Sequence, residues 1–583
     1  MTKFKYIIFG ICVVCGSMSC SKMLETESDM VEFEEDHTLN HATDSVYSVM
    51  GIINSIQKIA DRVVLLGEVR GDLIKTTAAA SADLKRLSAF NFDEANSYNQ
   101  VSDYYAVINN CNYFLAHVDT AMERRGRNLF MREYAAVKSY RAWTYLQLAL
   151  AYGEVPLILQ PLMTEKDARK AMDPKINPYK DIKTICETFI NDLTPYVGVN
   201  LPDYQSINRM NSKNFFIPMR ALLGDLCLWA GQYKEAARWY NAYLNDKYEP
   251  IGLSRNRVTW SSSTQFKDTD ISGSHGTTSD DEVLCFIPME SNSFQGNVSN
   301  LRHLFNSTRE NHYYFELTYT PAMTKLSTDQ LYCFENSSEG KTTKDTIYAQ
   351  RDGLKYSSMV GDLRLYNDVT ESTSGTQDEY SEYSSNTQTI RKIEQSRITM
   401  YRRTMVYLRY AEALNRAGYP QTAFAILKHG ICEDVLKERV DTVERKLVAD
   451  LAYFDPNEDK FKLYDEQGNL RMRGIHAIGS GDVHADTLYV LPQPKTALPT
   501  REDTVNYQIP LVEDMIITEM ALEGAFEGYR FNDLMRVALR RNDPAYLAKP
   551  ISRRNSKSDD ESDYDADLRQ KLMNPKNWYL PLQ

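Results

Sequence analysis

The sequence predicts a predominantly α-helical protein, in which tetratricopeptide-like helix pairs form a scaffold beside a loop-rich second subdomain. Two observations lead to this prediction. Apolar residues recur at three- and four-residue steps through several long stretches of the 583-residue chain, which is the period of an amphipathic helix. Between residues 251 and 395, in contrast, Ser, Thr, Asn, Asp and Gly dominate, a composition typical of loops.

The long helices follow one another along the chain. The first clear one covers residues 128–153, where Gly153 and then Pro156 end the pattern, as expected for a helix stop. Further helical stretches cover residues 179–197, 215–244 and 404–431.

Two of these stretches resemble each other in the way their halves are joined. Ala230-Gly231 is followed by Ala236, and Ala417-Gly418 is followed by Ala423 at the same spacing. In a tetratricopeptide unit a Gly makes the turn between two helices and a small Ala allows them to pack closely. Because the strict 34-residue period is absent, unrelated amphipathic helices remain the alternative. The organisation we expect has four parts: 1–19 as a signal peptide, 20–250 as a helical region, 251–400 as a loop-rich ligand-facing subdomain, and 401–583 as a second helical region.

The N-terminus predicts export and lipid anchoring. Lys3 and Lys5 precede an apolar run over residues 6–14, which is too short to span a bilayer and is typical of a signal peptide. Small residues then lead to Cys20, in a pattern similar to a bacterial lipobox. We therefore expect the Cys20 thiol to carry the lipid anchor, with ordinary secretory cleavage near Ser19 as the alternative.

Charge and cysteine usage exclude other classes of partner and site. The formal net charge is -12, opposite in sign to that of a nucleic-acid-binding protein. The cysteines after Cys20 are scattered, so neither a disulfide framework nor a metal site is predicted. No phosphate-binding, dinucleotide or metalloprotease motif is found, and no cofactor is expected. A loop with His476, Asp482, His484 and Asp486 is interpreted as a polar surface turn.

Several motifs, in their order along the chain, resemble the SusD/RagB family of nutrient-uptake outer-membrane lipoproteins. They include Arg70-Gly71-Asp72, a long helix ending in the run 153–157, and Tyr579-Leu580-Pro581-Leu582. The most specific is the run 523–534, EGAFEGYRFNDL, in which Gly524 replaces the usual Leu. The resemblance implies a SusD-like fold and a surface lipoprotein that captures oligosaccharides for a TonB-dependent, SusC-like transporter and performs no chemistry. A peptide ligand, a surface glycosidase and a purely structural lipoprotein remain as alternatives.

The C-terminal signature is interpreted as scaffold. Glu519, Glu523 and Glu527 recur every four residues on one helical face. Gly528 suits a helix C-cap, and Arg530 is expected to pair with Glu527 or with Asp533. Paired carboxylates for glycoside hydrolysis would instead need a defined separation across a cleft.

Candidate ligand-binding residues are aromatic and polar side chains outside the helical cores, since sugar rings stack on aromatic faces and their hydroxyls need polar partners. The resemblance implies the first three of the following, and the others lie in the loop-rich middle: Asp72, Tyr98, Asn99, Trp260, Tyr313, Tyr314 and Tyr319. For each residue the alternative is a buried loop anchor.

Overall fold

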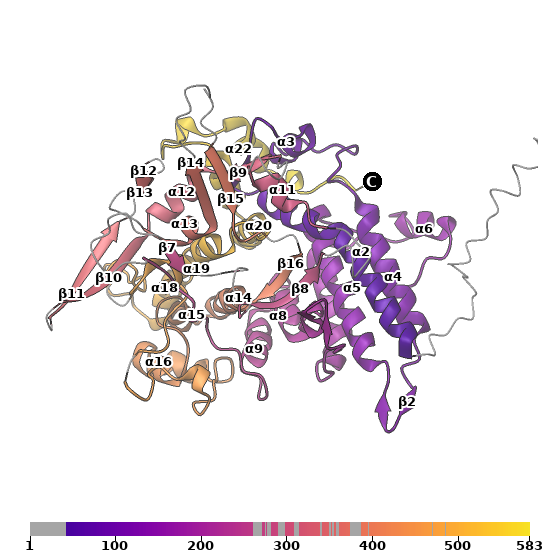
Figure 1. Cartoon of the computed structure of the whole chain (residues 1–583), viewed down its shortest axis with the longest axis horizontal. Helices are drawn as coiled ribbons and strands as arrows, with labels where there is room; N and C mark the ends of the chain where they lie inside the picture. The colour runs from indigo at the N-terminus through magenta and orange to yellow at the C-terminus, as the bar shows by residue number, and fades with distance from the viewer. Residues whose placement is uncertain are drawn as a thin grey trace, which may run out of the picture.

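The computed structural model shows a mostly helical chain (Figure 1). It describes residues 42–582 apart from 261–270, 274–275, 277–280, 290–297, 308–313, 339–340, 349–350, 353–354, 357–360, 374–385, 394–395, 469 and 484–485. The N-terminal helices stand side by side at one end of the molecule, and most strands of the middle region lie toward the other end (Figure 1). No helix within the described ranges is long and apolar enough to cross a membrane.

Four helices form the N-terminal bundle: α2 (Ala42–Glu68), α4 (Val101–His117), α5 (Met131–Tyr152) and α7 (Ile182–Leu193). Helix α5 lies in the middle and contacts the other three. Its buried Tyr140 and Tyr145 each donate a hydroxyl hydrogen bond to a backbone carbonyl, at 2.8 Å in both cases. Buried tyrosines are therefore part of the core. The helix ends at Gly153, whose φ of 77° suits only glycine without strain, as the sequence predicts.

The two predicted helix pairs are confirmed. They are α8 (Met219–Trp229) with α9 (Tyr233–Leu244), and α14 (Arg403–Arg416) with α15 (Pro420–Lys428). Gly231 and Gly418 make the turns with φ of 77° and 98°, and Ala236 and Ala423 are fully buried where the second helix meets the first. Helix α14 also packs on α9, so the two pairs stack.

The C-terminal signature forms the turn between α19 (Arg501–Gly524) and α20 (Arg530–Arg541). Gly528 does not cap α19 as predicted, because the helix ends at Gly524 and Gly528 lies at the far side of the turn with a φ of 90°. A Cβ on Gly67 would lie 1.8 Å from the carbonyl oxygen of Gly528. The turn thus rests directly on the backbone of α2, which only glycines permit.

The middle region holds short antiparallel strand pairs that the sequence analysis did not predict. They are β8 (Val283–Pro288) with β16 (Arg397–Arg402), β10 (Leu331–Ser338) with β11 (Lys341–Tyr348), β14 (Val369–Thr373) with β15 (Asn386–Ile390), and β1 (Ile74–Thr76) with β9 (Leu317–Tyr319). The last pair joins the N-terminal bundle to the middle region, with Ile74 opposite Tyr319.

The remaining elements are short. The helices are α3 (Ala82–Ser88), α6 (Glu165–Met172), α11 (Leu301–Phe305), α12 (Pro321–Thr328), α13 (Arg364–Asp368), α16 (Glu433–Arg439), α17 (Thr442–Leu447), α18 (Ala477–Ser480), α21 (Ala545–Arg553) and α22 (Ala566–Leu572). The strands are β2 (Glu123–Arg124), β3 (Arg127–Asn128), β4 (Ser206–Ile207), β5 (Met210–Asn211), β6 (Val258–Trp260), β7 (Ile271–Gly273), β12 (Arg351–Asp352) and β13 (Lys355–Tyr356). Six cysteines of the described ranges are buried free thiols, as small apolar side chains often are.

Candidate functional site

An open cleft of about 1060 Å³ lies on the described surface. The loop after α3, the C-terminal end of α5, the start of α7, one residue of α20 and residues 571–581 form it. We call it the terminal cleft. Its lining residues are Phe90, Asn91, Phe92, Tyr152, Gly153, Glu154, Asp181, Ile182, Leu539, Lys571, Pro575, Lys576, Asn577, Tyr579, Leu580 and Pro581.

Backbone hydrogen bonds hold the C-terminal wall of the terminal cleft in place. The Leu580 N–H donates to Ala151 O at 2.9 Å. The buried Arg70 guanidinium donates to Trp578 O at 2.9 Å, and the Trp578 indole N–H donates to Leu572 O at 2.8 Å. The first two hydrogen bonds join the C-terminal segment to α5 and to Arg70, and the third fixes the Trp578 ring within the segment.

The terminal cleft is lined by aromatic, amide and charged side chains. Phe92 and Tyr579 present partly exposed rings. Asp181 caps α7 and accepts the Thr184 N–H at 2.8 Å, and these hydrogen bonds from Thr184 lower the pKa of its carboxyl. Lys571 donates to the Asn91 side-chain oxygen at 2.6 Å. Aromatic faces beside amides and charged groups can stack on sugar rings and hydrogen-bond their hydroxyls.

Two of the predicted ligand residues lie behind this surface. Asp72 is 5% exposed and forms a two-point ion pair with Arg530, at 2.6 and 2.9 Å. The prediction that Arg530 pairs with Glu527 or Asp533 is therefore wrong, because β1 brings a more distant carboxylate within reach. Asn99 is fully buried, and its amide donates to Pro581 O at 3.2 Å. Asn99 thus positions the wall of the terminal cleft.

Tyr98 and Tyr314 belong to two segments that meet at Glu316, whose carboxylate accepts the Ser81 N–H at 2.6 Å. Tyr98 is half-buried, and its burial, followed by the charge of Glu316, raises the pKa of its hydroxyl to about 12. Tyr314 is 56% exposed, with its ring centroid 5.8 Å from that of His303. Tyr319 is partly buried in β9. We call Tyr98, Tyr314 and Glu316 the tyrosine surface.

Three further predicted residues, Trp260, Tyr313 and Cys20, do not join the tyrosine surface in the described part of the chain. The backbone of Trp260 ends β6, which contacts α18 rather than β1 or β9. Its side chain, Tyr313 and the anchor Cys20 lie outside the described residues.

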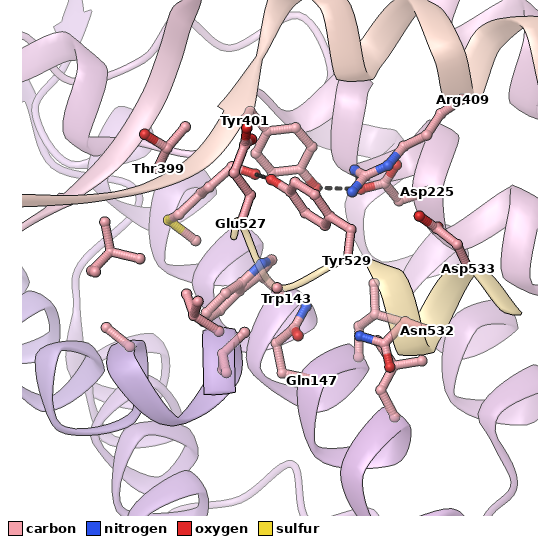
Figure 2. Close-up of a pocket in the computed structure, with 18 of the residues that line it drawn as sticks. Trp143, Gln147, Asp225, Thr399, Tyr401, Arg409, Glu527, Tyr529, Asn532 and Asp533 are labelled. Carbon is pink, nitrogen blue, oxygen red and sulfur yellow. Dashed lines mark hydrogen bonds and ion pairs between the residues drawn. The ribbon is translucent and has the colours of Figure 1, made fainter. Parts of the chain in front are cut away.

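A second, smaller hollow of about 70 Å³ lies inside the protein, between the helical scaffold and the signature turn (Figure 2). Its walls include Trp143 of α5, Tyr401 at the end of β16, and Tyr529 and Asn532 of the signature. Nothing in the sequence patterns indicated it, because its residues come from five or more separate elements.

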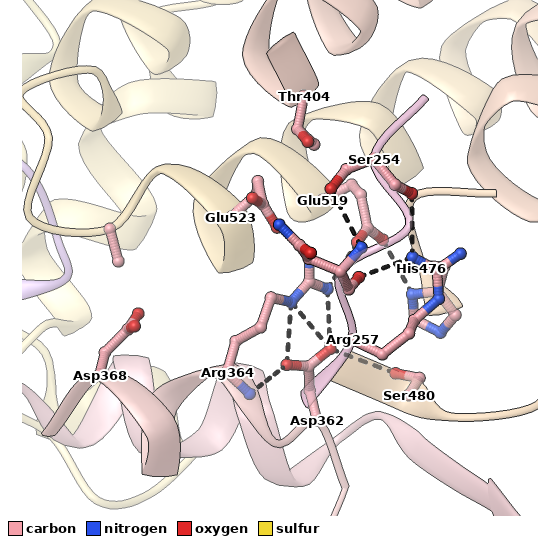
Figure 3. A network of polar contacts seen from close by, with 12 residues as sticks. Ser254, Arg257, Asp362, Arg364, Asp368, Thr404, His476, Ser480, Glu519 and Glu523 are labelled. Carbon is pink, nitrogen blue, oxygen red and sulfur yellow. Dashed lines mark hydrogen bonds and ion pairs between the residues drawn. The ribbon is translucent and has the colours of Figure 1, made fainter. Parts of the chain in front are cut away.

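The carboxylates of the signature enter a buried ion network (Figure 3). The Arg364 guanidinium contacts Asp362 at 2.7 Å, Glu519 at 2.5 Å and Glu523 at 2.9 Å, and all four side chains are 1% exposed or less. Although burial opposes ionisation, the charge of Arg364 keeps the pKa of Glu519 below its usual range. These carboxylates are paired ions within the core, which is the scaffold role that the sequence indicates.

His476 also belongs to this ion network. It is 1% exposed and lies 2.8 Å from Glu519 through Nδ1, with its ring stacked on Tyr489 at 3.8 Å between centroids. The interpretation of its loop as a surface turn is therefore wrong for His476 and for Asp486, which is 3% exposed. His484 lies outside the described residues. Among the residues that the structure describes, no group of three or more His, Cys, Asp or Glu could hold a metal ion.

Comparisons with known proteins support the fold. No family model matches the sequence, and no curated protein is similar to it. A SusD superfamily protein from Bacteroides vulgatus is similar in structure with a TM-score of 0.53 and 13% identity, over 93% of this chain and 98% of that one. A SusD-like carbohydrate-binding protein from Bacteroides fragilis is similar with a TM-score of 0.50 and 14% identity, over 86% and 87%. At this identity the likeness concerns the fold, and the chain has the SusD-like fold that its sequence motifs indicated.

Proposed function

We propose that this protein is a glycan-binding lipoprotein of the outer membrane, which captures oligosaccharides for a TonB-dependent, SusC-like transporter and does not cleave them. The observation that carries the proposal is the terminal cleft, found in a chain with the SusD-like fold. One of the proteins that share this fold is named a carbohydrate-binding protein.

The size and lining of the terminal cleft support an oligosaccharide rather than a single sugar. Its volume of about 1060 Å³ is at the upper end of the roughly 300 to 1,000 Å³ usual for small-molecule pockets. Two partly exposed rings, Phe92 and Tyr579, offer stacking faces. Asn577, Glu154 and Lys576 offer polar groups of three kinds for hydroxyls. The tyrosine surface would add two further aromatic faces, Tyr98 and Tyr314.

Calorimetry with a panel of oligosaccharides and peptides tests this proposal. Phe92→Ala and Tyr579→Ala should each weaken glycan binding roughly two- to tenfold, because a stacking contact contributes about 0.5 to 1.5 kcal/mol. Tyr248→Ala is the matched control, since Tyr248 is 84% exposed and lies outside the cleft.

Three other outcomes of the calorimetry would contradict parts of the proposal. Unchanged affinity in both cleft variants would exclude the terminal cleft as the binding site. Binding of peptides alone would favour the peptide-binding alternative, and shortening of a bound glycan would favour a surface glycosidase.

Anchoring and partnership have their own experiments. A palmitate analogue should label wild-type cells and not cells with Cys20→Ala, and equal labelling would refute acylation at Cys20.

Gentle detergent extraction should yield the protein together with a TonB-dependent barrel. Recovery as a monomer only would contradict the transporter partnership.

A further inference from the structure

The inner cavity of Figure 2 is separate from the terminal cleft and plays no part in the proposed function. It lies where α2, α5, α8, β16 and the signature turn meet. Its volume of about 70 Å³ corresponds to about five water molecules, or to one molecule of roughly six heavy atoms.

Four polar groups that line this cavity have no hydrogen-bond partner among the described residues. They are the indole N–H of Trp143, the amide of Gln147, the hydroxyl of Thr399 and the amide of Asn532, whose Oδ1 is buried. Figure 2 shows all four side chains around the same space. A buried polar group without a partner costs free energy, so the buried Oδ1 of Asn532 indicates that something polar fills the space beside it. Gln147 and Thr399 are partly exposed, and their polar groups are available to the same occupant.

The charged groups of the cavity, in contrast, are already paired. The pairs are Asp225 with Arg409 at 2.8 Å, Asp533 with Arg536 at 2.9 Å, and Glu527 with Arg402 at 2.6 Å. An ionic ligand would meet no counter-charge and would lose its hydration. The available groups therefore suit an uncharged ligand that both donates and accepts hydrogen bonds.

The walls also have apolar faces and an opening. The rings of Trp143, Trp229, Tyr401 and Tyr529 surround the space, and such rings pack against the C–H groups of polyols and sugars. Gln147, Trp229 and Asn532 keep partial exposure, so the cavity is reached from the surface on their side.

We propose that this cavity is a binding site for a small uncharged polyol of three or four carbons. Its hydroxyls hydrogen-bond to Trp143, Gln147, Thr399 and Asn532, and its carbon chain packs against the aromatic rings.

Tryptophan fluorescence of the full chain, titrated with glycerol, erythritol, xylitol and glucose, tests the proposal. Glycerol or erythritol should give a saturable change that Trp143→Phe reduces, with Trp229 still reporting, and that Trp239→Phe leaves, because Trp239 is outside the cavity. Gln147→Leu and Asn532→Leu keep side-chain size and remove one amide each. Both should weaken binding roughly two- to tenfold, while Gln467→Leu, on an exposed turn, should leave it unchanged.

Two outcomes would overturn the proposal. A linear, non-saturating response that is equal in wild type and in both leucine variants would show a solvent effect and a cavity filled by water only. Saturable binding that survives both leucine variants would place the polyol elsewhere. Neither outcome affects the glycan-binding proposal, since no residue of the terminal cleft lines the cavity.

Discussion

The signature turn has two faces, and their polar groups differ in one respect. On one face Glu523 bonds to Arg364 and Arg402 in the ion network, and Glu527, which also reaches the inner cavity, bonds to Arg402. On the other, a few residues later, Asn532 faces the inner cavity without a partner. Both faces are polar, although Asn532 keeps partial exposure and Glu523 is fully buried. The comparison shows that pairing, rather than polarity, distinguishes scaffold from a candidate site in this protein.

The largest effect is expected from breaking the paired face. Arg364→Met leaves three buried carboxylates without their main counter-charge, and removing one partner of a buried ion pair costs about 3 to 5 kcal/mol of unfolding free energy. Asn532→Leu removes a group that has no protein partner and should cost less than about 1 kcal/mol. Denaturant unfolding of both variants measures the contrast. Similar losses in the two variants would remove the distinction between the faces.

A second prediction uses the pH dependence of Glu68, which lies beneath the turn. Glu68 is fully buried and accepts the Gly528 N–H at 2.7 Å. Burial, and then the neighbouring charge of Glu527, raises its pKa from 4.5 to about 7, although the hydrogen bond from Gly528 and the charge of Lys392 oppose the shift. The protonated form is therefore favoured in the folded state. Its contribution to stability is complete below pH 4.5 and is lost as the pH rises through about 7.

Glu68→Gln keeps the acceptor for Gly528 and removes the titration. At pH 4 the variant should match the wild type, and at pH 8 it should be more stable by on the order of 3 kcal/mol. Unfolding free energies measured between pH 4 and pH 8 give the difference curve. A flat curve would mean that the pKa of Glu68 is the same in the folded and unfolded protein, and would contradict the prediction.

The smallest effects are expected at the predicted ligand residues outside the terminal cleft. Alanine substitutions at Tyr98, Trp260, Tyr313 and Tyr314 should each lower glycan affinity roughly two- to tenfold. The unfolding midpoint should stay unchanged, as expected for rings outside the paired core. Retained affinity in all four variants would restrict the ligand to the terminal cleft, and a lowered midpoint would identify the residue as a loop anchor.

The sequence predicts features that depend on neighbouring residues, and it does not predict contacts between residues far apart along the chain. The stop at Gly153 and the turns at Gly231 and Gly418 depend on residues within one or two helical turns, and all three were predicted. The partners of Arg530 and His476 were not, because Asp72 and Glu519 reach them only through the tertiary fold.

The terminal cleft could not be predicted for the same reason. Phe92 and Tyr579 become neighbours only because Asn99 and Ala151 bond to the C-terminal segment. The inner cavity combines side chains from several elements. It is marked by missing hydrogen bonds, which have no signature in a sequence.

The fixed C-terminal segment also bears on how the protein should be handled in the laboratory. Since Leu580 and Pro581 form part of the wall of the terminal cleft, any affinity tag or display fusion joined after Leu582 would start at its rim. Such a tag could block the cleft and make a competent protein test negative in a glycan screen. A purification handle placed ahead of α2, in a version without Cys20, the predicted lipidation residue, would keep that edge of the molecule clear.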